Sequence, residues 1–271
     1  MDAEFLEGTQ NKTFLGINIG TTKPTIDLIS IGIIAEDGRE YYAISKDFNL
    51  KEAWNRFQWR RKPIYDGIPG AYKEYWIRDN VLKPIWLELY EKECIKLNPT
   101  YKYNKQLDDM RISSMFNYKT MKHLINKYGK TNKQIAEEIK EFVYEKSFKD
   151  NKDTAIIHDN NWLNGKPQFY GYYCDYDWVV FCWLFGKMIN LPKGFPMYCI
   201  DVKQIYDEIK LPLKYIEHGI RAEMISDIPK PKVTIIQNLK QHPAYPKQTN
   251  EHHALQDARW IKQLYEFLNK L

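Results

Sequence analysis

The chain has 271 residues, of which 44% are hydrophobic and 28% charged, and its formal net charge is +5. This balance is typical of a folded globular protein, which excludes a disordered chain, and the longest apolar stretch, Trp178 to Phe185, is too short to cross a membrane. The first residues are acidic and lack a secretory leader pattern, so we expect a cytoplasmic protein.

The N-terminal part of the chain predicts an antiparallel sheet. Thr25 to Ala35 is rich in branched apolar residues, and the turn residues 36–39 lead into Glu40 to Ile44, which together indicate a β-hairpin. Met1 to Leu6 is expected to add a third strand, joined through a glycine-containing loop and ribbon.

Two carboxylates lie on that first predicted strand. Asp2 and Glu4 are two residues apart, and the period of two in a strand places both on one face of the sheet. Such a pair is an oxygen ligand set suited to Mg²⁺ or Mn²⁺. Because an acidic strand end produces this pattern by chance, the pair indicates a metal site only together with further acids.

The next segment changes to helical periodicity and predicts a mainly helical insertion at about 54–150. Pro84 to Glu93 and Tyr118 to Lys127 are candidate helices, and Pro63, Pro69 and Pro99 interrupt the region. Residues 132–143 predict a further helix, because apolar residues recur at helical spacing behind the capping hydroxyl of Thr131.

The remainder of the chain alternates between strands and helices, which predicts an α/β core within one domain of 271 residues. The expected strands are Thr154 to His158, Gln168 to Cys174 and Tyr198 to Val202. The expected helices are Tyr176 to Met188, Asp201 or Val202 to Ile209, and the amphipathic segment Ala254 to Leu271.

The strongest local motif lies at the start of the last predicted helix. His252 is five residues ahead of Asp257, and the small residues Ala254 and Ala258 allow close packing of that helix. His253, four residues ahead of Asp257, is the alternative, and we favour His252.

A middle acid follows an aromatic residue at a predicted strand-to-helix junction. Asp177 follows Tyr176 and precedes an apolar helix, and we favour it as the third ligand position. Asp175 is the alternative ligand, in which case Asp177 serves the helix N-terminus.

In this order, the motifs at Asp2 and Glu4, at Asp177, and at His252 and Asp257 resemble those of the DEDDh 3′→5′ exonucleases. A narrower resemblance, to a bacterial and phage branch of 3′→5′ exoribonucleases, is carried by Asp2–Phe5, Thr25–Ile33, Glu36–Ala43, Cys174–Trp178, Pro196–Val202 and His252–Arg259. It covers both ends of the chain but not Trp54 to Asp150.

The resemblance implies a ribonuclease H-like fold, a mixed β-sheet flanked by helices. It also implies that Asp2, Glu4, Asp177 and Asp257 hold two divalent ions, Mg²⁺ or Mn²⁺, and that His252 deprotonates the attacking water. The expected substrates are 3′ ends of single-stranded RNA in a bacterial or phage-infected cell, and the expected products are nucleoside 5′-monophosphates.

Three alternatives remain open at this point. The motifs do not read the 2′-hydroxyl, so a DNA exonuclease fits them as well, and so does a hydrolase of short oligonucleotides. A catalytically weak module that binds single-stranded nucleic acid is the non-enzyme alternative. It is motivated by a departure from the family: only Met1 precedes Asp2, so either a charged amino terminus lies near a ligand or the true start is upstream.

A segment rich in aromatic and cationic residues is the candidate substrate-binding region. Such residues stack on bases and neutralise phosphates. The competing interpretation is the packed face of an insertion helix with solvated cations around it. The candidates are Trp54, Arg56, Trp59, Arg60 and Arg61.

Overall fold

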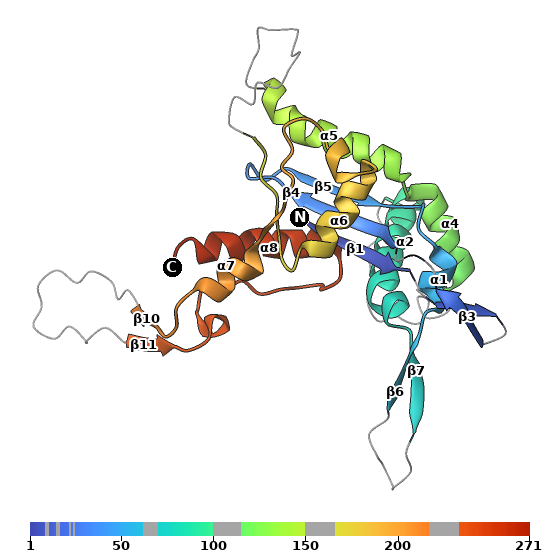
Figure 1. Cartoon of the computed structure of the whole chain (residues 1–271), viewed down its shortest axis with the longest axis horizontal. Coiled ribbons are helices and arrows are strands. Elements are labelled where there is room, and N and C mark those ends of the chain that lie inside the picture. The colour runs from blue at the N-terminus through green and yellow to red at the C-terminus, as the bar shows by residue number, and fades with distance from the viewer. Residues whose placement is uncertain are drawn as a thin grey trace, which may run out of the picture.

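A computed structural model describes residues 1–8, 11–14, 17–21, 23, 25–61, 70–99, 115–149, 166–216 and 233–271. Its centre is a three-stranded antiparallel sheet in the order β1–β4–β5, formed by Asp2–Glu7, Ile26–Ile34 and Glu40–Ile44 (Figure 1). The predicted N-terminal sheet is confirmed. The predicted ribbon between its first two strands is the hairpin β2–β3, Asn11–Phe14 and Ile17–Thr21.

The register of this sheet decides which residues share a face. Asp2 pairs with Gly32, Gly32 pairs with Tyr42, and Glu4 pairs with Ser30. Residues directly opposite one another point to the same side of a sheet, so all five lie on one face, which we call the acidic face. The ladder between β1 and β4 shifts register only beyond Glu4.

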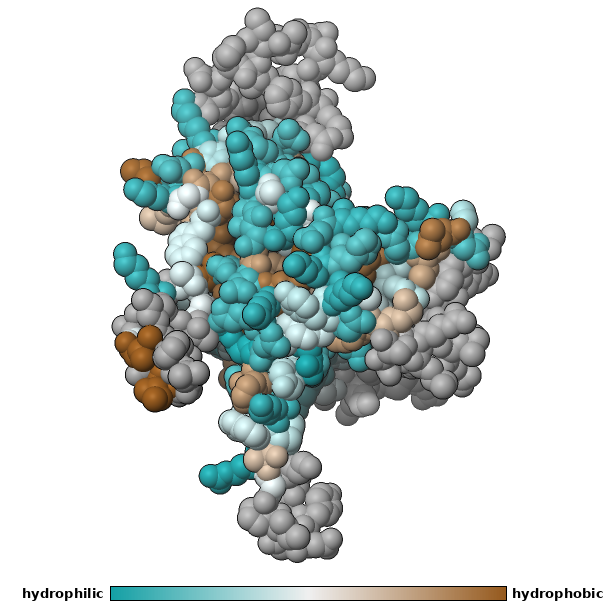
Figure 2. Space-filling model, turned by 90° about the vertical axis from the view of Figure 1, so that its right-hand side faces the viewer, coloured by the Kyte–Doolittle hydropathy of each residue, from teal (hydrophilic) through white to brown (hydrophobic). Residues whose placement is uncertain are grey.

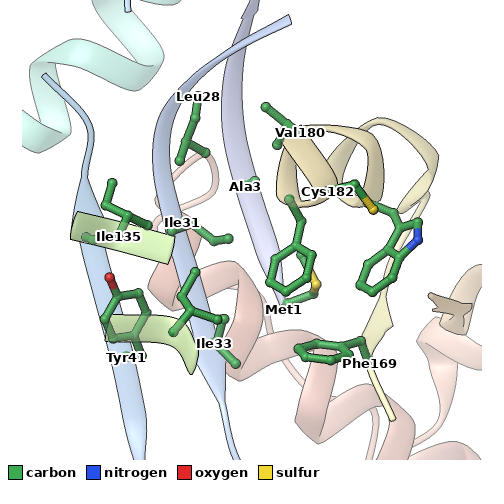
Figure 3. Packing of buried hydrophobic residues seen from close by; sticks show 14 of the residues in the cluster. Met1, Ala3, Leu28, Ile31, Ile33, Tyr41, Ile135, Phe169, Val180 and Cys182 are labelled. Atoms are coloured by element: carbon green, nitrogen blue, oxygen red, sulfur yellow. The ribbon is translucent and has the colours of Figure 1, made fainter. Parts of the chain in front are cut away.

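The opposite face of the sheet carries the main hydrophobic core. It packs against α5 (Asn132–Lys149) and α6 (Asp175–Leu184), both of which were predicted. A fully buried aliphatic side chain contributes roughly 2 kcal/mol, so this core and the pairing with β4 hold β1 in place. Residues labelled in Figure 3 are Met1, Ala3, Leu28, Ile31, Ile33, Tyr41, Ile135, Phe169, Val180 and Cys182.

The last helix, α8 (Ala254–Leu268), packs against β4 and confirms the predicted C-terminal helix. Its N-terminus lies directly on Gly32, where an added Cβ would be 2.4 Å from the carbonyl oxygen of Ala254 and 2.5 Å from the Cα of Leu255. Because only glycine permits this approach, Gly32 sets the position of the first turn of α8.

A short parallel pair, β8 (Tyr170–Gly171) and β9 (Ile200–Asp201), lies beside the start of β1. The amino group of Met1 donates a hydrogen bond of 2.6 Å to the carbonyl oxygen of Tyr170. The expected mixed sheet is therefore seen in two parts, and the strands around 170 and 200 are shorter than predicted. Residues 154–158, a further predicted strand, lie outside the described residues.

Helix α7 (Val202–Glu208) follows β9 directly, as predicted, and begins where the side chain of Asp201 accepts a hydrogen bond of 2.8 Å from the backbone NH of Lys203. The strand pair β10 (Leu213–Ile216) and β11 (Val233–Ile236) was not predicted. Two short 3₁₀ turns, Met188–Asn190 and Leu239–Gln241, complete this part. Among the described residues, no helix is both long enough and apolar enough to cross a membrane.

The segment predicted as an insertion contains helices that pack on the far end of the sheet. They are α1 (Leu50–Asn55), the π-helical turn η1 (Arg78–Leu82), α2 (Lys83–Leu97) and α4 (Tyr118–Tyr128). The helices expected around residues 84–93 and 118–127 are thus confirmed. Their core contains Ile29, Ile44, Ile85 and Trp86.

The same segment also contains a β-hairpin that we did not predict. Strands β6 (Gln58–Arg61) and β7 (Ala71–Glu74) pair antiparallel and project from the body of the molecule in Figure 1, and Figure 2 shows the same projection from the side. The interpretation of this stretch as the packed face of a helix is wrong for residues 58–61, which are all exposed. Pro63 and Pro69 follow in the sequence, and proline interrupts helices.

Candidate metal centre

Three carboxylates from the two ends of the chain meet on the acidic face. Asp2 and Glu4 come from β1, and Asp257 comes from the first turn of α8. Each offers an oxygen atom, and these atoms lie within 4.8 Å of one another. The contact between α8 and Gly32 brings Asp257 to this place, so the cluster can hold a metal ion as a direct result of strand register and helix packing.

Asp257 is buried and held by three hydrogen bonds. Its Oδ1 accepts a hydrogen bond of 2.7 Å from Nε2 of Gln248. Its Oδ2 accepts hydrogen bonds of 2.8 Å and 3.2 Å from the backbone NH groups of His252 and His253. Burial raises the pKa of Asp257, and these hydrogen bonds oppose the rise. The bonds fix the carboxylate in one orientation, as a metal ligand requires.

Asp177 stands beside the cluster, at the start of α6. Its side chain is 7% exposed, and its Oδ1 accepts a hydrogen bond of 2.6 Å from the backbone NH of Ala3, the residue between the two acids of β1. Burial raises the pKa of Asp177 to about 6. Asp175, the alternative from the sequence, is exposed. Of these two acids, Asp177 is therefore the one that contacts the strand carrying Asp2 and Glu4.

Burial and mutual repulsion raise the pKa values of the clustered acids. Burial, and then the charges of Asp257 and Asp177, raise the pKa of Glu4 to about 8. Burial raises the pKa of Asp2 well above its usual range, and the neighbouring acids add to this, whereas the Met1 amino group opposes it. A divalent cation supplies the compensating charge for such a group of buried oxygen ligands, so these residues fit a hard metal ion.

The two histidines of the last motif have different surroundings. The ring of His252 meets the ring of Trp76 edge to face at 4.7 Å between centroids, and the backbone of His252 has a φ of 67°. The ring of His253 stacks on Tyr42 at 4.8 Å, and its Nε2 lies 3.0 Å from a carboxylate oxygen of Glu88 in α2. His253 is thus engaged with the sheet and the helical segment.

The structure separates the candidate substrate residues into two groups. Trp54 packs against Phe116 at 4.9 Å between ring centroids, and Arg56 forms an ion pair with Glu52, so both are part of the local packing. The other three, on β6, are exposed: Trp59, Arg60 and Arg61.

Some residues that contact the site were not found from the sequence. Gln248 lies in a loop without a recognisable motif, and Glu88 is distant in sequence from the histidine that it contacts. Trp76 lies beyond the aromatic and basic stretch around residues 54–61 that the sequence analysis singled out, and it belongs to no motif of its own. The contacts of Trp76 and Glu88 with the two histidines are long-range and depend on the tertiary fold, whereas Gln248 lies nine residues before Asp257.

A segment of 52 residues, 19% of this chain, is 44% identical to a 3′-5′ exoribonuclease of Mycobacterium tuberculosis, and the same identity is found for this enzyme in strains CDC 1551 / Oshkosh and H37Rv. The matched segment spans 29% of the length of these curated relatives. No family model matches the chain. The similarity thus relates part of this chain to a bacterial nuclease.

Proposed function

We propose that this protein is a metal-dependent 3′→5′ exoribonuclease of the DEDDh type, with a ribonuclease H-like domain, acting in the cytoplasm of a bacterial or phage-infected cell. The observation that carries the proposal is the convergence of Asp2, Glu4 and Asp257 within 4.8 Å, with buried Asp177 beside them. The partial similarity to bacterial 3′-5′ exoribonucleases supports the same reaction.

The four carboxylates of Asp2, Glu4, Asp177 and Asp257 would hold two divalent ions, Mg²⁺ or Mn²⁺. When bound, such ions lower the pKa of water and stabilise the charge on the leaving oxygen of a phosphodiester. The hydrogen bonds to Asp257 and Asp177 keep two of the ligands in fixed orientations.

His252 would accept the proton of the attacking water. A neutral imidazole is suited to this role near neutral pH, and the backbone NH of His252 is already bonded to Asp257, which places the residue beside the carboxylates. In the reaction, the water oxygen bonds to phosphorus, the bond to the 3′-oxygen breaks, and the terminal nucleotide leaves as a 5′-monophosphate.

The test uses single-stranded RNA and DNA of matched sequence, each labelled either at the 5′ end or on the last phosphodiester. With Mn²⁺ we expect the 5′-labelled RNA to shorten stepwise and the terminal label to be released as a 5′-monophosphate. Chelation of the metal should stop both reactions, and added Mg²⁺ or Mn²⁺ should restore them. Slower shortening of DNA would support a preference for RNA.

Other outcomes of this experiment would contradict the proposal. Faster degradation of DNA would identify a DNA exonuclease, and cleavage of only the shortest strands would identify an oligonucleotide hydrolase. Binding of RNA without release of any monophosphate would identify the module as a binding protein.

A further inference from the structure

The hairpin β6–β7 has two chemically different faces. We call it the arm, and it includes Phe57 and Tyr75, which flank its strands. Trp59 pairs with Lys73, and Arg61 pairs with Ala71, so their side chains share one face. The ring contacts of Phe57 with Trp59 and with Tyr75, each at 5.8 Å between centroids, place all of them together. We call this the basic-aromatic face.

The basic-aromatic face holds positive charge beside open aromatic rings. The ammonium group of Lys73 lies 4.2 Å from the ring centroid of Phe57 and 5.6 Å from that of Trp59, and Trp59 is 65% exposed. Among the described residues, neither Lys73 nor Arg61 forms an ion pair. A cation next to an exposed ring binds a phosphate and a stacked base at the same time.

The other face of the arm is electrically balanced. Arg60 forms an ion pair of 2.6 Å with Glu74, and Tyr72, which pairs with Arg60, supplies an exposed ring of its own. Unbalanced positive charge is therefore confined to the basic-aromatic face, which makes Tyr72 a matched control for Trp59.

The root of the arm lies beside His252. A hollow at its root is lined by residues of β1 and of the arm, among them Phe5, Phe57 and Trp76. Phe5 follows Glu4 directly on β1, Trp76 contacts the ring of His252, and Phe57 belongs both to the hollow and to the basic-aromatic face. The hollow therefore lies between His252, which Trp76 contacts, and the basic-aromatic face, to which Phe57 belongs.

We propose, on the basis of the proposed exonuclease function, that the basic-aromatic face binds the single-stranded part of the substrate 5′ of the bond to be cleaved. Four paired residues span about 13 Å, a length that accommodates about four nucleotides stacked 3.4 Å apart. A strand that extends along the arm gains contacts that a dinucleotide bound at the carboxylates lacks, so on this proposal the arm makes the protein selective for longer strands.

The test compares kcat/KM for a twelve-nucleotide RNA with kcat/KM for a dinucleotide. Wild-type protein should prefer the longer strand. Trp59→Ala should lower the ratio of the two kcat/KM values about tenfold, because it removes one base-stacking ring. Lys73→Ala should lower the ratio as well and should reduce the salt slope of binding by about 0.7. Tyr72→Ala, on the balanced face, should behave as wild type.

Binding is measured separately, with a fluorescent twelve-nucleotide RNA in the presence of a chelator, so that this readout does not depend on hydrolysis. Equal binding by wild type, Trp59→Ala and Tyr72→Ala would overturn the role of the arm, and so would a wild type that cleaves both lengths equally well. If wild type releases no nucleotide but Trp59→Ala still binds more weakly, the exonuclease proposal fails and the arm proposal stands. Melting temperatures of the variants verify folding.

Discussion

The candidate metal centre and the arm are built in contrasting ways. The carboxylates lie on β1 and on α6 and α8, which both pack on β1, and the hydrogen bonds to Asp177 and Asp257 restrict these side chains further. The arm consists of two four-residue strands whose side chains are mostly exposed. Bond cleavage needs atoms held within a fraction of an ångström, whereas a single strand is bound by stacking that tolerates adjustment. Variants in the two regions should therefore fail in different ways.

Asp257→Asn should have the largest effect and should reduce kcat by at least about 10⁴-fold on strands of every length, because a metal ligand is lost. Asparagine keeps an oxygen for the backbone NH groups of His252 and His253, so we expect the folded structure to persist. Single-turnover hydrolysis and circular dichroism measure the two properties. Full activity of folded Asp257→Asn protein would contradict the metal assignment.

His252→Ala should reduce kcat by about 10³-fold, again for all strand lengths, because it removes the proposed proton acceptor. His253→Ala should have a smaller effect on kcat, since its ring is engaged with Tyr42 and Glu88. Rates measured between pH 5 and pH 9 for both variants distinguish the two residues. Loss of the acidic limb of the profile in His253→Ala alone would reverse their assignment.

Trp76 lies between the two regions and allows a direct test of the comparison. Because the ring of Trp76 contacts His252, Trp76→Ala should lower kcat about tenfold. The loss should be the same for a dinucleotide and for a twelve-nucleotide strand. A loss seen only with the longer strand would instead assign Trp76 to the arm.

The smallest effect concerns stability. The pKa of Glu4 rises from 4.5 to about 8 on folding, so between these values the metal-free folded protein binds more protons than the unfolded chain, and its unfolding free energy falls as pH rises. At pH 8 without metal, Glu4→Gln should melt about 5 °C above wild type. Added Mn²⁺ should raise the melting temperature of wild type more than that of the variant. Calorimetry at pH 5 and pH 8 provides the measurement, and identical pH dependence of both proteins would contradict it.

The sequence allowed local features of the site to be predicted, and the long-range ones had to come from the fold. The period of two in a strand places Asp2 and Glu4 on one face, and the resemblance to a known motif singled out Asp257. The structure brings these three acids together. The contact of Gly32 with α8 depends on how a helix and a strand from distant parts of the chain pack, which no local pattern encodes.

The arm was missed for a related reason. Tryptophan and tyrosine favour strands whereas arginine favours helices, so local preferences in this stretch conflict, and pairing between residues 58–61 and 71–74 decides the conformation. The contact between Glu88 and His253 joins residues 165 positions apart and likewise has no local signature.

The way in which the arm is attached has an evolutionary consequence. Gln58 and Glu74 are paired neighbours, so the chain leaves the body and returns to it at adjacent points. A segment attached in this way can be lengthened, shortened or exchanged between related proteins while the ends of the body stay the same distance apart. Under the proposed function, the preference for one population of transcripts over another is then free to diverge in a lineage while the carboxylate cluster stays constant.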